Sequence, residues 1–320
     1  MKRDYVILLF LTFGALVLPK LIGNEYYLTV FIFIGIHAIL AIGLNLLMGY
    51  AGQISLGHAA FYAMGAYFSG VLTANYAWNP WAAAVVAMIA TALVALIVGI
   101  PTLKLEGHYL AMATLGIGII IQKLIEEFSG ITGGNNGLTN IPSLDIGGFE
   151  LNTDLRYYYF VLVVLLVLTA LSIHLIHSRV GRACRAIHSS RLAANIMGVD
   201  VQKMKVRMFM LSAVFASISG SLYAHYQLYM DPSTFGFGFS VELVVMTVLG
   251  GLGSVWGGIL GASIINLLSE FITEFTEYGP VIYGFILVTM VLFIPDGLAG
   301  LAGRVGSLFP DGKREKGASA

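Results

Sequence analysis

Charged residues are scarce in this 320-residue sequence. They make up 11% of it, while hydrophobic residues make up 58%, against about 25% and about 45–50% in soluble globular domains. A water-soluble fold could not bury that much apolar surface, so the composition excludes an ordinary soluble protein. The 17 basic and 17 acidic residues cancel, and no overall charge points to nucleic acid as a partner.

Cysteine and catalytic motifs are also nearly absent. Cys184 is the only cysteine, which excludes an internal disulfide and a metal cluster held by thiolates. There is no phosphate-binding loop of the Gly-x-x-x-x-Gly-Lys-Ser/Thr type and no metal-binding His-x-x-x-His face. We therefore predict that the chain is not an enzyme, binds no cofactor directly and does not itself hydrolyse ATP. A membrane-embedded enzyme that uses His37, His58 and His108 is the alternative.

What the sequence does have is a series of long apolar runs. A helix needs about 20 apolar residues to cross about 30 Å of hydrocarbon. Runs of this kind lie at residues 5–22, 28–48, 58–74, 82–103, 108–128, 157–177, 207–229 and 279–295. We predict an all-α integral membrane protein with a transmembrane domain over residues 1–300 and about eight crossings. The first run follows Lys2 and Arg3 and is interpreted as a membrane anchor, with a cleaved signal peptide as the alternative.

The distribution of charge predicts how the chain is oriented. The loop at residues 178–206 contains six basic residues: Arg179, Arg182, Arg185, Arg191, Lys203 and Lys205. Short loops rich in lysine and arginine stay on the cytoplasmic side. This loop is therefore predicted to be cytoplasmic, together with both termini and a flexible tail at residues 301–320. The segment at residues 129–155 contains acidic residues and no lysine or arginine, and it is predicted to face outward.

One further apolar region, at residues 240–268, is interrupted by Gly250, Gly251 and Gly253. Two arms of about 14 residues would each reach only about 21 Å, too short to cross. We predict a re-entrant or broken-helix hairpin that enters and leaves on the outer face, because this arrangement keeps both termini cytoplasmic. Counting its arms gives eight to ten spans. A single continuous span is the alternative.

Two glycine-rich stretches, residues 49–58 and 250–258, are candidates for breaks in membrane helices. Non-helical backbone is tolerated in a membrane only where protein or a water-filled cavity satisfies its polar groups, and broken helices indicate a solute path. Glycine also permits close helix packing without any role in transport. We favour packing for two stripes of small residues at four-residue intervals: Gly253, Gly257 and Gly261, and Ser212, Ala216, Gly220 and Ala224.

His37 and Glu242 are the ionisable residues placed deepest in apolar runs. Such residues are functional candidates by default. For His37 we favour a neutral histidine hydrogen-bonded to a neighbouring helix over a proton relay. Glu242 follows Asp231 and Pro232 by about ten residues and is expected near the outer mouth.

The basic loop contains a predicted short helix that begins at Arg191. Ser189 or Ser190 can cap its start, and Gly198 can end it in the left-handed conformation that glycine tolerates. Leu192 and Ile196 lie four residues apart and form an apolar ridge. A short helix in water with an exposed ridge normally docks onto another surface. The alternative is a helix that lies on anionic lipid.

Several motifs resemble those of one protein family. They are Gly43–Phe61 followed by Gly65–Tyr67, Thr132–Thr139, Gly181–Ile187 with Ala193, Ala194 and Met197–Val199, and Gly250–Ser254 with Gly257. Together they resemble the permeases of bacterial branched-chain amino acid ABC importers, of the LivM type. The resemblance covers about residues 28–295.

The resemblance implies a multi-pass protein of the bacterial inner membrane that works with other proteins. The partners would be a LivH-like permease, two cytoplasmic ATPase subunits that bind the ATP, and a periplasmic binding protein that meets the outer loop near residues 132–140. The coupling helix that fits an ATPase cleft would be Arg191, Leu192, Ala193, Ala194, Asn195, Ile196, Met197 and Gly198. Relatives often carry an acidic residue near the start of this helix, where this chain has Arg191.

The expected mechanism is alternating access, with the coupling helix moving the span that starts at Arg207. Candidates to line the solute path are Asn45, Gln53, Ser55, His58, Thr114, Glu242, Gly250 and Gly251. The expected solutes are leucine, isoleucine and valine. Urea, amides or other amino acids are alternatives within the family, and a stand-alone secondary transporter or channel is the alternative outside it.

Overall fold

The computed structural model describes residues 2–21, 25–146, 149–273, 284–285 and 288. Its helices are α1 Lys2–Leu21, α2 Glu25–Asn45 with a π-helical turn Leu46–Tyr50, α3 His58–Ala74, α4 Pro80–Thr102, α5 His108–Glu127, α6 Ser129–Thr132, α7 Asp154–His177, α8 Arg179–Ser189, α9 Arg191–Ile196, α10 Val201–Gln227, α11 Phe237–Gly250 and α12 Val255–Thr273. Short 3₁₀ turns lie at Gly134–Asn136 and Pro232–Phe235. The prediction of an all-α bundle is confirmed, except for one small antiparallel pair of strands, β1 Asp145–Ile146 and β2 Phe149–Glu150.

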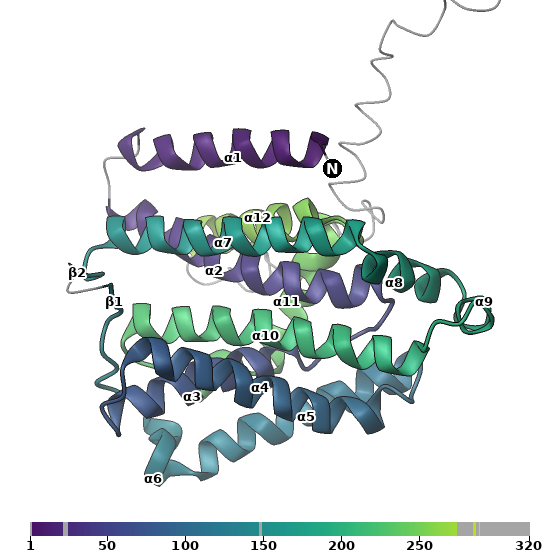
Figure 1. Cartoon of the computed structure of the whole chain (residues 1–320). Coiled ribbons are helices and arrows are strands. Elements are labelled where there is room, and N and C mark those ends of the chain that lie inside the picture. The colour runs from purple at the N-terminus through teal and green to yellow at the C-terminus, as the bar shows by residue number, and fades with distance from the viewer. Residues whose placement is uncertain (1, 22–24, 147–148, 274–283, 286–287, 289–320) are drawn as a thin grey trace, which may run out of the picture.

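The long helices lie side by side, and the bundle has two distinct ends (Figure 1). One end carries α8 and α9, and we call it the α9 end. The other carries β1, β2 and α6, and we call it the β end. Helices α2 and α10 form the centre, because 83% and 72% of their most apolar windows are buried, against 28% for α4 and 17% for α5.

Five helices of the described residues are long and apolar enough to cross a membrane. They are Tyr26–Tyr50, Pro80–Thr102, His108–Glu127, Asp154–His177 and Val201–Gln227, and each overlaps a predicted span. The predicted spans at 5–22 and 58–74 correspond to α1 and α3. Most of the predicted span at 279–295 and all of the tail at 301–320 lie outside the described residues. The count of eight crossings and the orientation of the termini therefore stay predictions.

Helices α11 and α12 form the predicted hairpin, which reverses direction at residues 251–254. The strand-like bridge between Met230 and Leu138 lies seven residues before α11, and the Ser240 Oγ atom near the start of α11 accepts a hydrogen bond from the Ala59 N–H at the start of α3 (3.3 Å). Helix α12 returns along α2, with the His37 Nδ1 atom 2.8 Å from the Asn266 Oδ1 atom. The predicted hydrogen bond of His37 to a neighbouring helix is thus confirmed. The predicted length of the second arm, about 14 residues, is wrong because α12 continues for 19 residues to Thr273.

The small-residue stripes pack helices closely, as predicted. A Cβ atom on Gly220 of α10 would collide with the Tyr62 carbonyl oxygen of α3, and one on Gly261 of α12 would collide with the Met246 carbonyl oxygen of α11. Because a larger residue at either position would force two helices apart, these glycines serve the packing of the bundle.

Candidate functional site at the α9 end and the helix breaks

Helix α8 begins the α9 end, and sequence reasoning missed it. The Ser178 Oγ atom caps the helix by accepting hydrogen bonds from the backbone N–H groups of Val180 (3.1 Å) and Gly181 (3.5 Å). Gly181, Cys184 and Ile187 are buried on one face, and burial raises the pKa of the Cys184 thiol to about 11, against a smaller opposing effect of Arg185. The signal was available, because these three residues recur at helical spacing between arginines.

Helix α9 follows directly and matches the predicted helix. The Ser190 Oγ atom accepts a hydrogen bond from the Ala193 N–H at 3.3 Å, so Ser190 and not Ser189 is the cap. Gly198 ends the turn with a φ of +82°, the left-handed conformation expected for it. Ala194 is buried and holds the helix against the rest of the chain.

Three large apolar side chains of this segment point outward. Leu192, Ile196 and Met197 are 72%, 77% and 82% exposed, and we call them the α9 ridge. The ridge lies in the basic loop. Asp200 follows Met197 by three residues, and hydrogen bonds from Lys203 lower the pKa of its carboxyl, so this side chain is ionised at neutral pH. The predicted pair of Leu192 and Ile196 is therefore confirmed as an exposed ridge and is extended by Met197.

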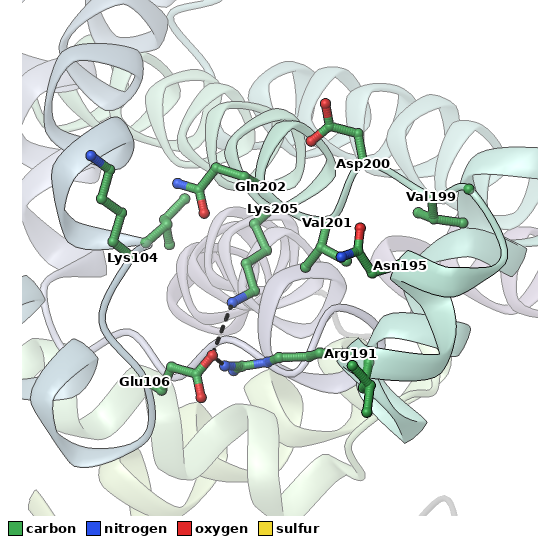
Figure 2. A pocket seen from close by; sticks show the side chains of 12 residues that line it. Lys104, Glu106, Arg191, Asn195, Val199, Asp200, Val201, Gln202 and Lys205 are labelled. Carbon is green, nitrogen blue, oxygen red and sulfur yellow. Dashed lines mark ion pairs between the residues drawn. The ribbon is translucent and has the colours of Figure 1, made fainter.

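A cleft of about 710 Å³ separates α9 from the loop that joins α4 to α5. Figure 2 shows the side chains of Arg191 and Lys205 pointing at the carboxylate of Glu106. Arg191 forms an ion pair with Glu106, and the Lys205 Nζ atom lies 4.0 Å from the same carboxylate. Lys205 is only 4% exposed. Among the residues that line this cleft, Glu106 thus holds two cations that come from α9 and α10.

This arrangement gives Arg191 a partner within the chain. Its guanidinium is drawn toward the loop before α5 instead of extending into solvent beside the α9 ridge. A carboxylate therefore does lie at the start of α9, although residue 106 supplies it and not residue 191. The ion pair also connects α9 to α5, which begins two residues after Glu106.

The α9 end touches the first helix break, residues 51–57 between the π-helical turn and α3. Gly52 has a φ of +64°, and a Cβ atom there would lie only 3.3 Å from the Nδ1 atom of His188 in α8. On the other side of the break, the Leu56 N–H donates to the Thr114 Oγ1 atom of α5 at 3.1 Å. Movement of α8 or α5 would therefore be felt directly in this break.

Asn45, the last residue of α2, holds the second break, residues 251–254. Its Nδ2 atom donates to the carbonyl oxygens of Gly251 (3.0 Å) and Ser254 (2.8 Å), and its Oδ1 atom accepts from the Gly253 N–H (2.9 Å). One buried amide thus satisfies three polar backbone groups of the turn between α11 and α12. The two glycine-rich stretches were predicted separately, and the structure brings them together, because Gly49 packs against Gly253 beside this side chain.

The other candidate path residues lie around the same two breaks. Gln53, Ser55, His58 and Thr114 are buried within the chain, Gly250 packs against Gly257, and Glu242 is half-buried. The His58 Nε2 atom lies 3.0 Å from the Ser212 Oγ atom of α10. Within the described part of the chain, the Gln53 amide, the Ser55 hydroxyl and the His58 Nδ1 atom have no hydrogen-bond partner. Their roles in a path stay predictions.

Comparison with known proteins gives a consistent result. The sequence profile of a family described as "Branched-chain amino acid transport system / permease component" matches residues 26–294. The chain is 32% identical to the high-affinity branched-chain amino acid transport system permease protein LivM of Escherichia coli K12, over 82% of this chain and 67% of LivM.

Two further relatives carry the name of the second permease. The chain is 25% identical to LivH of Escherichia coli K12 over 82% of this chain and 91% of LivH. It is 27% identical to a probable LivH of Methanocaldococcus jannaschii over 84% of this chain and 90% of that protein. No solved structure matches the chain.

Proposed function

Because this chain belongs to the family of permease components of branched-chain amino acid transport systems, we propose that it is the permease subunit of an ATP-binding-cassette importer. It is a multi-pass membrane protein of a transport system. In the proposal it sits in a bacterial inner membrane beside a second, LivH-like permease. Of the two ATPase subunits, one binds at the α9 end of this chain, and a periplasmic binding protein meets the β end.

The α9 ridge is the observation that carries the proposal. Burial of one leucine, isoleucine or methionine side chain is worth about 1.5–3 kcal/mol, so three exposed ones, two on the six-residue helix and one at its C-cap, provide a strong binding site. The ridge projects from a basic loop at one end of the bundle, as Figure 1 shows for α9. A protein cleft that receives the ridge would bury it without displacing the rest of the chain.

Two contacts would carry movement of α9 into the bundle. One leads through α8, where His188 lies against Gly52. The other leads through the ion pair of Arg191 and Glu106 to α5, where Thr114 holds Leu56. Both end at the break between α2 and α3. The proposed coupling thus reaches the breaks by two routes besides α10, the route expected from the sequence.

The proposed solutes are leucine, isoleucine and valine, as the names of the relatives suggest. Urea, short amides and other amino acids are the alternatives within the same architecture. The chain itself contributes no ATP hydrolysis in this proposal. Its partner ATPases supply the energy, and the binding protein supplies much of the selectivity, because it presents the solute to the permease.

Replacement of Leu192 and Ile196 by aspartate tests the proposal. The double variant is expected to reach the membrane in normal amounts but to lose its co-purification with ATPase subunits and its solute uptake. Leu192→Met with Ile196→Leu keeps the ridge apolar and is the matched control, expected to retain both. Unchanged uptake in the aspartate variant would count against the proposal, and uptake by a chain with which no ATPase subunit co-purifies would favour a stand-alone transporter or channel.

A further inference from the structure

The cleft in Figure 2 begins where an apolar, outward surface of the bundle ends. Helix α4 has no charged side chain, and its last outward residues, Ile97 and Ile100, are 68% and 49% exposed. The Ile100 carbonyl oxygen accepts a hydrogen bond from the Gln202 Nε2 atom (3.3 Å), and Gln202 lines the cleft. Exposed aliphatic side chains on an uncharged helix of spanning length suit hydrocarbon. The cleft therefore begins at the depth expected for lipid headgroups.

The charges of the cleft do not cancel. Five charged residues line it: the cations Lys104, Arg191 and Lys205 and the carboxylates Glu106 and Asp200. The Asp200 carboxylate lies 2.9 Å from the ammonium of Lys203, which is not among the lining residues, so its charge is compensated outside the cleft. Among the described residues of the lining, Glu106 is left to balance three cations. The cleft thus has an excess of positive charge.

Lys205 contributes a cation that the cleft does not fully satisfy. Its side chain is 4% exposed, and its Nζ atom points at the Glu106 carboxylate (Figure 2). The distance between them is 4.0 Å, which is beyond hydrogen-bond length, and Arg191 makes the closer contact with the same oxygen atom. The contact with Glu106 therefore does not satisfy the three N–H donors of the ammonium. A second anion in the cleft would accept hydrogen bonds from them.

We propose that this cleft binds the phosphate group of an anionic phospholipid. Basic pockets between membrane helices bind such headgroups, and a cleft of about 710 Å³ has room for one. Lys205 would donate hydrogen bonds to the phosphate oxygens. Arg191 has five N–H donors and can contact Glu106 and the phosphate together. Lys104, whose ammonium points away from Glu106 in Figure 2, would act through its charge.

The position of the cleft favours lipid over an acidic side chain of a partner subunit. The acyl chains of a bound lipid would lie along Ile97 and Ile100, directly beside the headgroup. Two of the three side chains of the α9 ridge, Ile196 and Met197, do not line the cleft. A protein that covers the ridge would therefore leave much of the cleft free. The proposal requires a membrane but no ATPase subunit.

Lipid titration of the purified full chain tests the proposal. In an uncharged detergent no anionic bilayer surface attracts the basic loop, and binding of phosphatidylglycerol can be measured by native mass spectrometry. Lys205→Gln is expected to lower the affinity about tenfold, the loss expected for one hydrogen bond between charged groups. Lys203→Gln removes the same charge two residues away, outside the cleft, and is the matched control, expected to bind like the unsubstituted chain. Lys205→Arg keeps the charge and is expected to retain most of the affinity.

Two further ligands identify what the cleft recognises. The unsubstituted chain is expected to bind phosphatidylglycerol in preference to phosphatidylcholine, which has no net charge. Inorganic phosphate at the same concentration is expected not to displace the lipid, because it has no acyl chain to lie along α4. Displacement by inorganic phosphate would overturn the assignment to lipid. Equal binding of the two lipids, or equal losses for Lys203→Gln and Lys205→Gln, would overturn the site itself.

Gel filtration of each variant shows whether it has folded. If Lys205→Gln does not fold, Lys104→Gln provides the second variant, expected to lower the affinity for phosphatidylglycerol about fivefold, and an unchanged affinity would then overturn the proposal. Loss of ATPase co-purification in Lys205→Gln with unchanged lipid binding would assign the cleft to the ATPase contact instead. Because the titration contains no ATPase subunit, its outcome does not depend on the proposed importer function.

Discussion

Two surfaces of the chain expose the same kinds of side chain and invite opposite interpretations. On α4, the outward side chains of Ile89, Leu93 and Ile97 are between 52% and 68% exposed, and the α9 ridge is exposed to a similar extent. Helix α4 has 23 residues and no charged side chain, whereas α9 has six residues in a loop rich in arginine. The exposed fraction of a side chain therefore does not tell lipid from a protein partner.

Length and neighbouring charge make that distinction. An uncharged helix of about 20 residues or more matches the thickness of the hydrocarbon core, so exposed leucine and isoleucine on α4 are at their most stable in lipid. A helix of six residues between basic side chains cannot cross. The α9 ridge is thus more stable against another protein, unless it lies flat on the membrane surface.

An aspartate substitution on each of the two surfaces distinguishes lipid from a protein partner, and it has the largest expected effect. Leu93→Asp places a carboxylate near the middle of α4, which raises the free energy of membrane insertion by about 3 kcal/mol. Its amount in the membrane fraction is expected to fall severalfold. Ile196→Asp is expected to leave that amount unchanged while it reduces the co-purification of ATPase subunits. Both quantities can be read from one tagged preparation.

Leu93→Met and Ile196→Met are the controls, because both retain an apolar side chain. They are expected to behave as the unsubstituted chain in both measurements. If Ile196→Asp lowered the membrane amount as strongly as Leu93→Asp, the α9 ridge would be in lipid. That result would favour the amphipathic helix on the membrane surface over the coupling helix.

The α9 ridge could be predicted from the sequence because its signals are local. Ser190, Leu192, Ile196 and Gly198 lie within nine residues, and each acts on its immediate neighbours. The signal for the outward face of α4 is equally local, because it comes from one continuous apolar run. Helix α8 has an equally local pattern in Gly181, Cys184 and Ile187, but the prediction for this loop covered only the helix that ends at Gly198.

The contacts that give the ridge and the breaks their position are not local. Glu106 lies 85 residues before Arg191, and Asn45 lies 206 residues before Gly251. No spacing rule connects such pairs, since only the packing of whole helices brings them together. The glycines at both breaks indicated interrupted helices, but not that one asparagine of α2 holds the turn between α11 and α12.

Removal of the Asn45 amide tests what holds the turn between α11 and α12 in place. The unbroken helix α4 needs no such support. Asn45→Ala leaves three backbone groups of residues 251–254 without their partner, and the expected loss of stability is about 2–4 kcal/mol. We expect a lower melting temperature in detergent and faster proteolysis within the turn. Asn266→Ala, which removes the hydrogen bond to His37 in an unbroken helix, is the control, with an expected loss of about 1 kcal/mol.

Equal losses for the two asparagine variants would mean that packing alone holds the turn. The close packing of small residues makes that a real alternative, since a Cβ atom on Gly49 would collide with the backbone nitrogen of Gly253. The same atom would collide with the Asn45 Oδ1 atom, so Gly49→Ala would disturb the packing and the amide together. The two asparagine variants are therefore the measurement that separates the amide from the packing.

The ion pair at the α9 end has the smallest expected effect on stability. Arg191 and Glu106 are both partly exposed, and such pairs contribute about 0–1 kcal/mol. Glu106→Arg is therefore expected to change the melting temperature little. It would nevertheless place three cations together in the cleft and release α9 from the loop before α5. We expect uptake per ATP hydrolysed to fall more than stability does.

The charge swap Glu106→Arg with Arg191→Glu provides the decisive control, because it restores an ion pair while it exchanges the two side chains. If the pair transmits movement from α9 to α5, the swap recovers most of the uptake per ATP hydrolysed that Glu106→Arg loses. A swap that behaves like the single variant would leave His188 and Gly52 as the remaining contact between the α9 end and the first break. The α9 ridge would then act on the break through α8, and the ion pair in Figure 2 would serve only to position Arg191.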